Sequence, residues 1–390
     1  MIRALSALAG ALVVAGPVSA YASPGDVDRG FGNDGRVLVR ASGAMTGMSL
    51  VDERRPLVTV QPTDGDQSSG DPFSVALSAT GRVLERTPVP APDPLALPLG
   101  FVVRASGVDG AGRTVVVGAA SPGEDRVLRF LPDGALDASY GSGGAVDLAS
   151  VSEPFTVVVK PDGRAHVFGD TTQAVLDTTG RSLLDRTHSS VSWPGSQPGV
   201  IDTVADGPGD TVLVAGRSVD DHPFVMRLRV DGRLDSRFGK RGFSVLPGPW
   251  FIPGGVIQDR RGRLLVGGST NRRALVERLT ARGRLDTAFA DGGRAQIAPP
   301  RGLKGWNARY LALDARNRIV VAGSGWTKDQ DVGAFRPVIA RLKARESPTP
   351  SQSSIHLRKN VTPAGRAASP TAQRCQFGAD GRARVAKVDD

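Results

Sequence analysis

The sequence predicts an all-β protein, a six-bladed β-propeller of four-stranded antiparallel blades that is closed by its N-terminal strand. Two observations lead to this prediction. A motif of the form Leu-Asp-x-x-Phe-Gly-x-x-Gly recurs at intervals of about fifty residues, and the intervals contain short runs rich in Val, Leu and Phe. Four short strands per repeat are typical of a propeller blade.

The recurring motif has the chemistry of a turn. Its glycines allow positive φ, its Asp can accept hydrogen bonds from nearby backbone N–H groups, and its aromatic residue can fill a gap between sheets. The best copies occupy 27–35, 136–144, 234–242 and 285–293, and two worn copies lie at 80–84 and 179–183. The worn copies predict two irregular blades.

The order of strands predicts how the ring closes. We label the strands of a repeat a to d: a precedes a Gly-rich turn, b and c follow it, and d follows the Leu-Asp-x-x-Phe-Gly motif. The chain begins with d, continues through five complete blades and ends with a, b and c. The first strand, 36–40, is therefore expected beside the last c strand, 338–342, which removes two exposed edges. An open β-solenoid is the alternative, in which this pairing has no purpose.

These units resemble the bacterial delta-60 repeat family. The resemblance is carried by the motif at 234–242, by the Asp-Gly-Arg turn at 162–164 and by similar copies elsewhere, and it covers about residues 24–342. It implies a propeller-like module of exported proteins. It implies no particular activity.

The two ends of the chain differ from the repeats. Arg3, the apolar run 4–15 and the small-x-small sequence 20–22 predict a signal peptide at 1–22, and hence a secreted or extracytoplasmic protein. The propeller is expected at 23–343 and a disordered Pro/Ser/Arg-rich tail at 344–390. Segment 377–382 echoes 31–36, either as a repeat remnant or by chance. Cys375 is the only cysteine, so no internal disulfide can form.

The formal net charge of +10 bears on partners. A solvated surface accounts for most of it, so we expect no nucleic-acid ligand, while the basic tail could contact anionic polymers of the cell envelope. No later segment of eighteen apolar residues predicts a transmembrane helix. We expect a monomer.

Propeller topology would place the a–b and c–d turns on one face and the b–c and d–a loops on the other. The second set is long and individual, as recognition loops tend to be. Aromatic side chains in these loops could stack on sugar rings or anchor a protein partner, or else fold back as plugs over the channel. The candidate ligand-binding residues are Trp193, Trp250, Trp306, Trp326, Phe101 and Phe155.

The same loops carry carboxylates, which are the ligands that Ca²⁺ prefers. The candidate metal ligands are Asp64, Asp66, Asp71, Asp220 and Asp221. Segment 64–68 begins like a calcium loop but lacks the later Gly and Glu of that loop, and a solvated loop is the alternative. Ca²⁺ is the one cofactor that we consider.

Two functions remain open from the sequence. The leading hypothesis is a non-enzymatic exported propeller that binds a protein or glycan through its Trp-bearing, acidic loop face. The rival is a metal-dependent hydrolase or lactonase with carboxylates such as Asp220 and Asp221 at the channel mouth. Motifs for a nucleophilic serine, a zinc-binding helix or a phosphate loop do not occur. His166 is expected inside a b strand, where packing is its default role.

Overall fold

The computed structural model describes residues 24–344 except 65–66, 69–71, 89–96, 98–100, 120, 122, 149–150, 152–153, 170–171, 188–197, 208, 248–250, 271 and 328–334. Near the C-terminus it describes 376–377 and 383–384. The predicted signal peptide lies outside the described residues. The chain divides into two units, Met1–Glu346 and Ser347–Asp390. Among the described residues, no helix has the length and hydropathy to cross a membrane.

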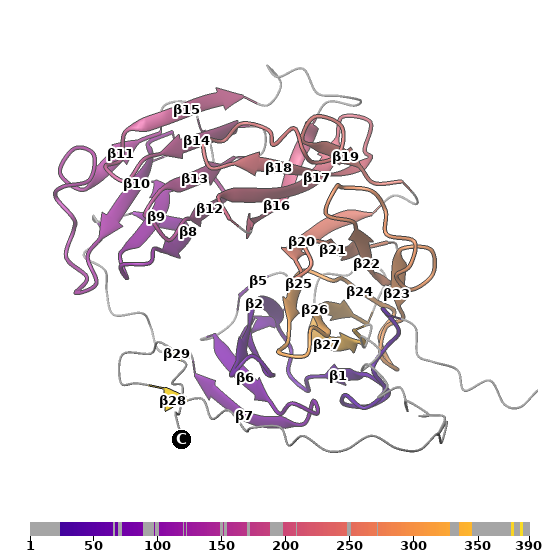
Figure 1. Cartoon of the computed structure of the whole chain (residues 1–390). Coiled ribbons are helices and arrows are strands. Elements are labelled where there is room, and N and C mark those ends of the chain that lie inside the picture. The colour runs from indigo at the N-terminus through magenta and orange to yellow at the C-terminus, as the bar shows by residue number, and fades with distance from the viewer. Residues whose placement is uncertain are drawn as a thin grey trace, which may run out of the picture. The chain divides into compact units, whose positions relative to one another are not determined.

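The described part of the first unit forms six antiparallel sheets of four or five strands, so the all-β prediction is confirmed (Figure 1). Sheet 1 contains β2 (Ala44–Val51), β3 (Arg55–Gln61), β6 (Phe73–Leu77) and β7 (Val83–Pro88). Sheet 2 contains β8 (Val102–Val108), β9 (Thr114–Ala119), β10 (Asp125–Phe130) and β11 (Ala145–Asp147). Sheet 3 contains β12 (Thr156–Val159), β13 (Ala165–Phe168), β14 (Thr172–Leu176) and β15 (Ser182–Thr187).

Sheets 4 to 6 complete the series. Sheet 4 contains β16 (Pro198–Gly207), β17 (Thr211–Ser218), β18 (Pro223–Arg229) and β19 (Phe243–Val245). Sheet 5 contains β20 (Ile252–Gln258), β21 (Leu264–Ser269), β22 (Ala274–Leu279) and β23 (Arg294–Ile297). Sheet 6 contains β24 (Gly305–Trp306), β25 (Tyr310–Leu313), β26 (Ile319–Trp326), β27 (Arg336–Leu342) and β1 (Arg36–Leu38). A small pair, β4 (Thr63–Asp64) and β5 (Gln67–Ser68), lies in the β3–β6 connection.

The pairing expected between the chain's first strand and its last c strand is present. In β1, Arg36 lies opposite Ala340 and Leu38 opposite Val338 of β27. Sheet 6 departs from the expected four strands, because β24 and β25 both pair with β26. This extra strand is formed by the connection that enters the sheet.

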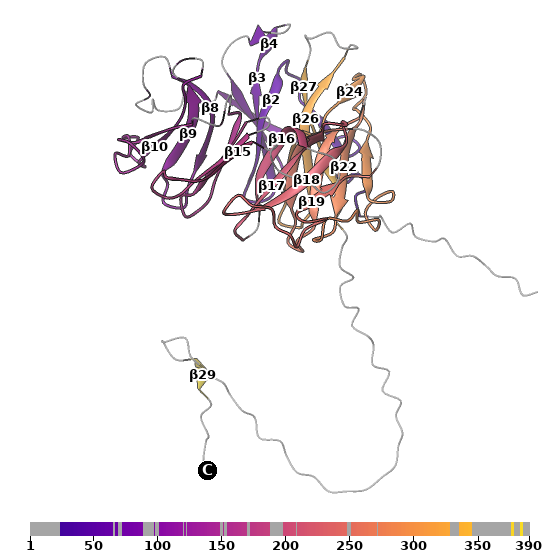
Figure 2. The ribbon, with the colours of Figure 1, turned by 90° about the horizontal axis from the view of Figure 1, so that it is seen from above.

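The hydrophobic core lies between the faces of neighbouring sheets. Five pairs of first strands are in contact: β8 with β12, β12 with β16, β16 with β20, β20 with β25, and β25 with β2. Figure 2 shows neighbouring sheets standing face to face. In sheets 2 to 6 the second strands are buried at consecutive positions, as at Val115–Val117 and Val212–Ala215, because both of their faces are covered. In sheet 1 the second strand, β3, is buried at alternate positions, which indicates that one face of this strand is less covered. Most of the apolar clusters combine side chains from two adjacent sheets.

The two worn copies of the motif produce the irregular connections that were predicted. In sheets 1 and 3 the third and fourth strands are joined by tight turns, 78–82 and 177–181, rather than by the longer motif. Both sheets also show a register shift where the fourth strand begins. In the second unit, expected to lack regular structure, β28 (Gln376–Phe377) pairs with β29 (Ala383–Arg384).

Candidate functional site

Three of the predicted aromatic residues lie at the same end of their sheets, where first strands begin and second strands end. This end, with its b–c and d–a connections, is called the loop end below. Phe101 precedes β8, Phe155 precedes β12, and Trp326 is the last residue of β26. All three side chains are partly exposed. Each belongs to a different sheet, so they share an end of the fold without being neighbours in the sequence.

Glycine backbones seat two of these rings. A Cβ atom on Gly305 would overlap the indole of Trp326, and one on Gly118 would lie 2.7 Å from Cε1 of Phe101. Both contacts need a residue without a side chain, so each ring packs closely against the glycine backbone. Phe251 contacts Gly268 in the same way but is fully buried. Gly118 and Gly268 both lie near the ends of second strands, β9 and β21, whereas Gly305 begins β24.

Trp306 corrects one prediction, because it is not available as a surface platform. Its side chain is fully buried in the cluster between sheets 5 and 6, which includes Phe289. The indole N–H donates a hydrogen bond to the carbonyl of Ile297, 2.9 Å away. A buried Trp needs such an acceptor, and strand β24 positions the ring to reach it. Trp306 is therefore a core residue.

Several predicted site residues lie outside the described residues. These are Trp193, Trp250, Asp66 and Asp71. For Asp64 the structure gives the backbone, which pairs with Gln67 in the β4–β5 pair. Their roles stay predictions.

The acidic pair in the β17–β18 connection is partly engaged by an arginine. Arg217 donates to Asp221 at 3.2 Å and, through Nε and Nη2, to both oxygens of Asp202 at 3.1 and 3.2 Å. The hydrogen bond with Asp202, reinforced by the nearby charges, raises the pKa of Arg217. Asp220 is exposed in the same turn. Within the described ranges, no group of three or more His, Cys, Asp or Glu side chains is placed to hold a metal ion.

An unexpected charged cluster lies beneath each full copy of the turn motif. An Arg of the third strand donates from Nε to the motif's Asp at 2.8 Å, and its guanidinium stacks over the motif's aromatic ring at 4.2 to 5.1 Å from the centroid. We call this arrangement the seam cluster. Its members are Arg341, Asp28 and Phe31; Arg129, Asp137 and Tyr140; Arg227, Asp235 and Phe238; and Arg278, Asp286 and Phe289.

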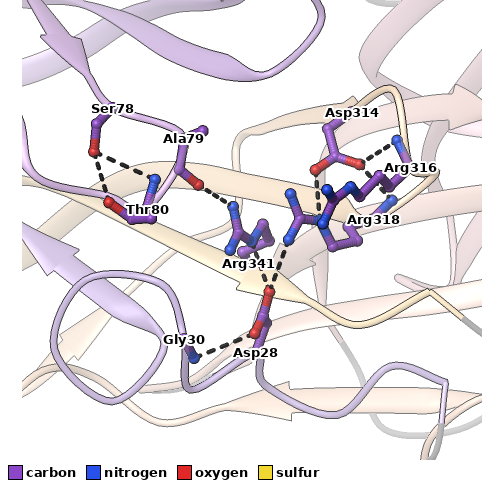
Figure 3. A network of polar contacts seen from close by, with 9 residues as sticks. All are labelled: Asp28, Gly30, Ser78, Ala79, Thr80, Asp314, Arg316, Arg318 and Arg341. Atoms are coloured by element: carbon purple, nitrogen blue, oxygen red, sulfur yellow. Dashed lines mark hydrogen bonds and ion pairs between the residues drawn. The ribbon is translucent and has the colours of Figure 1, made fainter.

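Seam clusters join one sheet to the next. Arg341 of sheet 6 donates to the carbonyl of Ala79 in sheet 1 at 2.5 Å, and Arg129 of sheet 2 donates to Thr178 in sheet 3 at 2.6 Å. Figure 3 shows Arg341 between Asp28 and Ala79, with Arg318 reaching Asp28 and Asp314 from the other side. Burial raises the pKa of Tyr140 to about 12, so this ring stays neutral beneath its arginine.

Sheet 3, whose motif is worn, is joined to sheet 4 by a lysine. The ammonium of Lys160 donates hydrogen bonds to Asp206 at 2.5 Å and to the carbonyls of Gly209 and Thr211 at 3.1 Å. His166 lies on β13, as expected, and is fully buried beside this seam. Neither of its ring nitrogens has a hydrogen-bond partner in the described structure. Burial, with the charges of Lys160 and Arg164, lowers its pKa to about 4.

The sequence interpretation missed the arginines of the seam cluster. The sequence does carry a signal for them: each arginine is a charged residue in a largely apolar third strand, and it occupies the same position in each repeat. Regular recurrence inside buried strands is evidence for a buried ion pair.

Comparison with known proteins supports a propeller repeat in part of the chain. The model of a family described as "Domain of unknown function (DUF5122) beta-propeller" matches residues 112–140, from Gly112 in the turn before β9 to Tyr140. The more specific delta-60 resemblance stays a prediction. The chain has no match among the curated proteins.

Solved structures with distant similarity include three named proteins. The WD40 domain of Toxoplasma gondii coronin is 8% identical, with 83% of this chain and 90% of that chain covered and a TM-score of 0.42. YCF48 from Cyanidioschyzon merolae is 12% identical, with 78% and 88% covered and a TM-score of 0.39. The gluconolactonase XC5397 from Xanthomonas campestris is 15% identical, with 79% and 100% covered and a TM-score of 0.39.

Proposed function

We propose that the six sheets are the blades of one ring, closed by β1, and that this exported protein is a binding scaffold whose loop end recognises a glycan. The observation that carries the proposal is the seating of partly exposed rings on glycine backbone. Flat aromatic faces held rigidly in this way suit stacking against sugar rings, because little side-chain freedom is lost on binding.

The charged groups at the same end favour binding over catalysis. Asp202 and Asp221 are both hydrogen-bonded to Arg217, so a guanidinium already supplies the positive charge that a metal ion would bring. Paired Asp and Arg side chains are suitable hydrogen-bonding partners for sugar hydroxyls. The rival function, a metal-dependent hydrolase or lactonase with Ca²⁺ or another cation, would require these carboxylates to be released from Arg217.

The test uses the mature chain on immobilised glycans. We expect Trp326→Ala and Phe101→Ala each to weaken capture of the bound glycan at least tenfold, which corresponds to about 1.4 kcal/mol of binding free energy. Leu84→Ala is the matched control, since Leu84 is an exposed apolar residue on the outer strand β7. Capture that survives both ring substitutions would contradict the proposal. Metal-dependent hydrolysis of lactones that is lost in Asp202→Asn would support the rival instead.

A further inference from the structure

Grooves recur at the seams between sheets, always in the same place. One side of each groove is the fourth strand of a sheet, together with the turn just before that strand. The other side is the segment of the next sheet that packs against this turn. The three described grooves of this kind lie at the seams of sheets 6 and 1, 4 and 5, and 5 and 6, with volumes of about 940, 460 and 690 Å³. We call them seam grooves.

The seam groove between sheets 6 and 1 is lined with arginines. It could hold roughly thirty water molecules at liquid density. Its polar side chains are the four arginines Arg36, Arg40, Arg82 and Arg336, together with Asn33, Ser42 and Thr80. They come from three separate parts of the chain, so the cluster exists only because β1 pairs with β27 and packs beside sheet 1.

Little negative charge balances this groove. Arg36 lies 3.5 Å from a carboxylate oxygen of Asp34, and its buried Nε–H has no acceptor. For Arg40, Arg82 and Arg336, no carboxylate of the described residues forms an ion pair with the side chain. Solvent exposure of Arg40 and Arg82 keeps both guanidinium groups open to a ligand.

The seam groove between sheets 5 and 6 shows that the fold does not require this positive charge. In the groove between sheets 5 and 6 the charged residues are Asp26, Asp291 and Arg294, and Arg294 is occupied by Glu277 at 2.6 Å. The groove between sheets 4 and 5 carries Lys240, Arg282 and Arg284 but has about half the volume. The same backbone arrangement thus accepts either sign of charge. The four arginines at the first seam need a different explanation.

We propose that the seam groove between sheets 6 and 1 binds a linear phosphate-bearing polymer. Guanidinium groups bind phosphate oxygens in a bidentate manner, and several along one groove neutralise several phosphates of one chain. The groove has no aromatic residue in its lining, so it lacks the stacking platforms that single-stranded nucleic acids use. Its size exceeds the need of a single phosphate ion.

The experiment measures binding of long-chain inorganic polyphosphate to the mature full-length protein over a range of salt concentrations. The groove variant is Arg40→Gln/Arg82→Gln/Arg336→Gln. We expect its affinity to fall at least tenfold, and the slope of log K against log salt to become shallower by about 2, because three phosphate contacts are lost. If the triple variant does not fold, the double variant at the two exposed positions, Arg40 and Arg82, replaces it, with an expected slope change of about 1.4.

A matched control separates the groove from general charge. Arg54→Gln/Arg237→Gln/Arg301→Gln removes the same charge from exposed positions outside the seam grooves, and it should leave the affinity within about threefold. An equal loss in this control would overturn the proposal. So would polyglutamate binding as tightly as polyphosphate, which would indicate an acidic polypeptide. Competition by orthophosphate at equal phosphate concentration would rule out a polymer. Trp326→Ala should leave polyphosphate binding unchanged, so the loop-end proposal can fail independently.

Discussion

Replacing Arg341 by Met should lower the free energy of unfolding by about 3 to 5 kcal/mol, the cost of breaking a buried ion pair by removing one partner. The side chain of Arg341 is 4% exposed and holds Asp28 at 2.8 Å. Its loss also removes the bond to Ala79 and the stacking over Phe31. Chemical denaturation followed by fluorescence or circular dichroism would measure the change.

The matched control for this prediction is Arg82→Met at the same seam. Arg82 is exposed, and an exposed substitution of this kind changes stability by no more than about 0.5 kcal/mol. A loss below about 1 kcal/mol for Arg341→Met would show that the seam cluster contributes little. Sheets 6 and 1 would then be held together by apolar packing alone.

Acidification from pH 7 to pH 4 should cost about 3 kcal/mol of stability through His166 alone. The native pKa of about 4 lies below the ordinary value of 6.5, so the unfolded chain binds a proton in this window while the native protein does not. The contribution of His166 is complete above pH 6.5 and declines by about 1.4 kcal/mol for each pH unit below it. The charged groups that act on the ring are Lys160, Arg164, Asp162 and Asp231.

The variant His166→Leu tests this prediction, because leucine fills a similar volume without a titratable group. Between pH 7 and pH 4 it should lose about 3 kcal/mol less stability than the parent protein. Val158→Ala, which truncates the cross-strand neighbour of His166, should lower stability by the same amount at every pH. Identical pH dependence in the parent and His166→Leu would contradict the assignment.

Local patterns predicted the strands and turns well. The positive φ of Gly32, Gly141 and Gly239 confirms the turn chemistry of the motif, and the tight turns of sheets 1 and 3 appear where the copies are worn. These features depend on a few neighbouring residues, which is why a repeat reveals them. The pairing of β1 with β27 also followed from counting strands along the chain.

Features that depend on distant residues could not be predicted in this way. Asp28 and Arg341 are separated by 313 positions, and nothing local indicates that they form an ion pair. Trp306 was expected at the surface, but the extra strand β24 turns its ring into the core. The arginine-lined seam groove combines segments near residues 36, 82 and 336, so only the assembled sheets bring it together.

The central claim is that the N-terminal strand belongs to the last sheet, and native-state hydrogen exchange tests it most directly. The two strands are hydrogen-bonded to each other, so the amides of β1 and β27 should become exposed to exchange in the same unfolding event, the unfolding of sheet 6. Peptides covering 36–38 and 336–342 should therefore show matched protection in mass spectrometry. Rapid exchange of 36–38 beside a protected β27 would contradict the account.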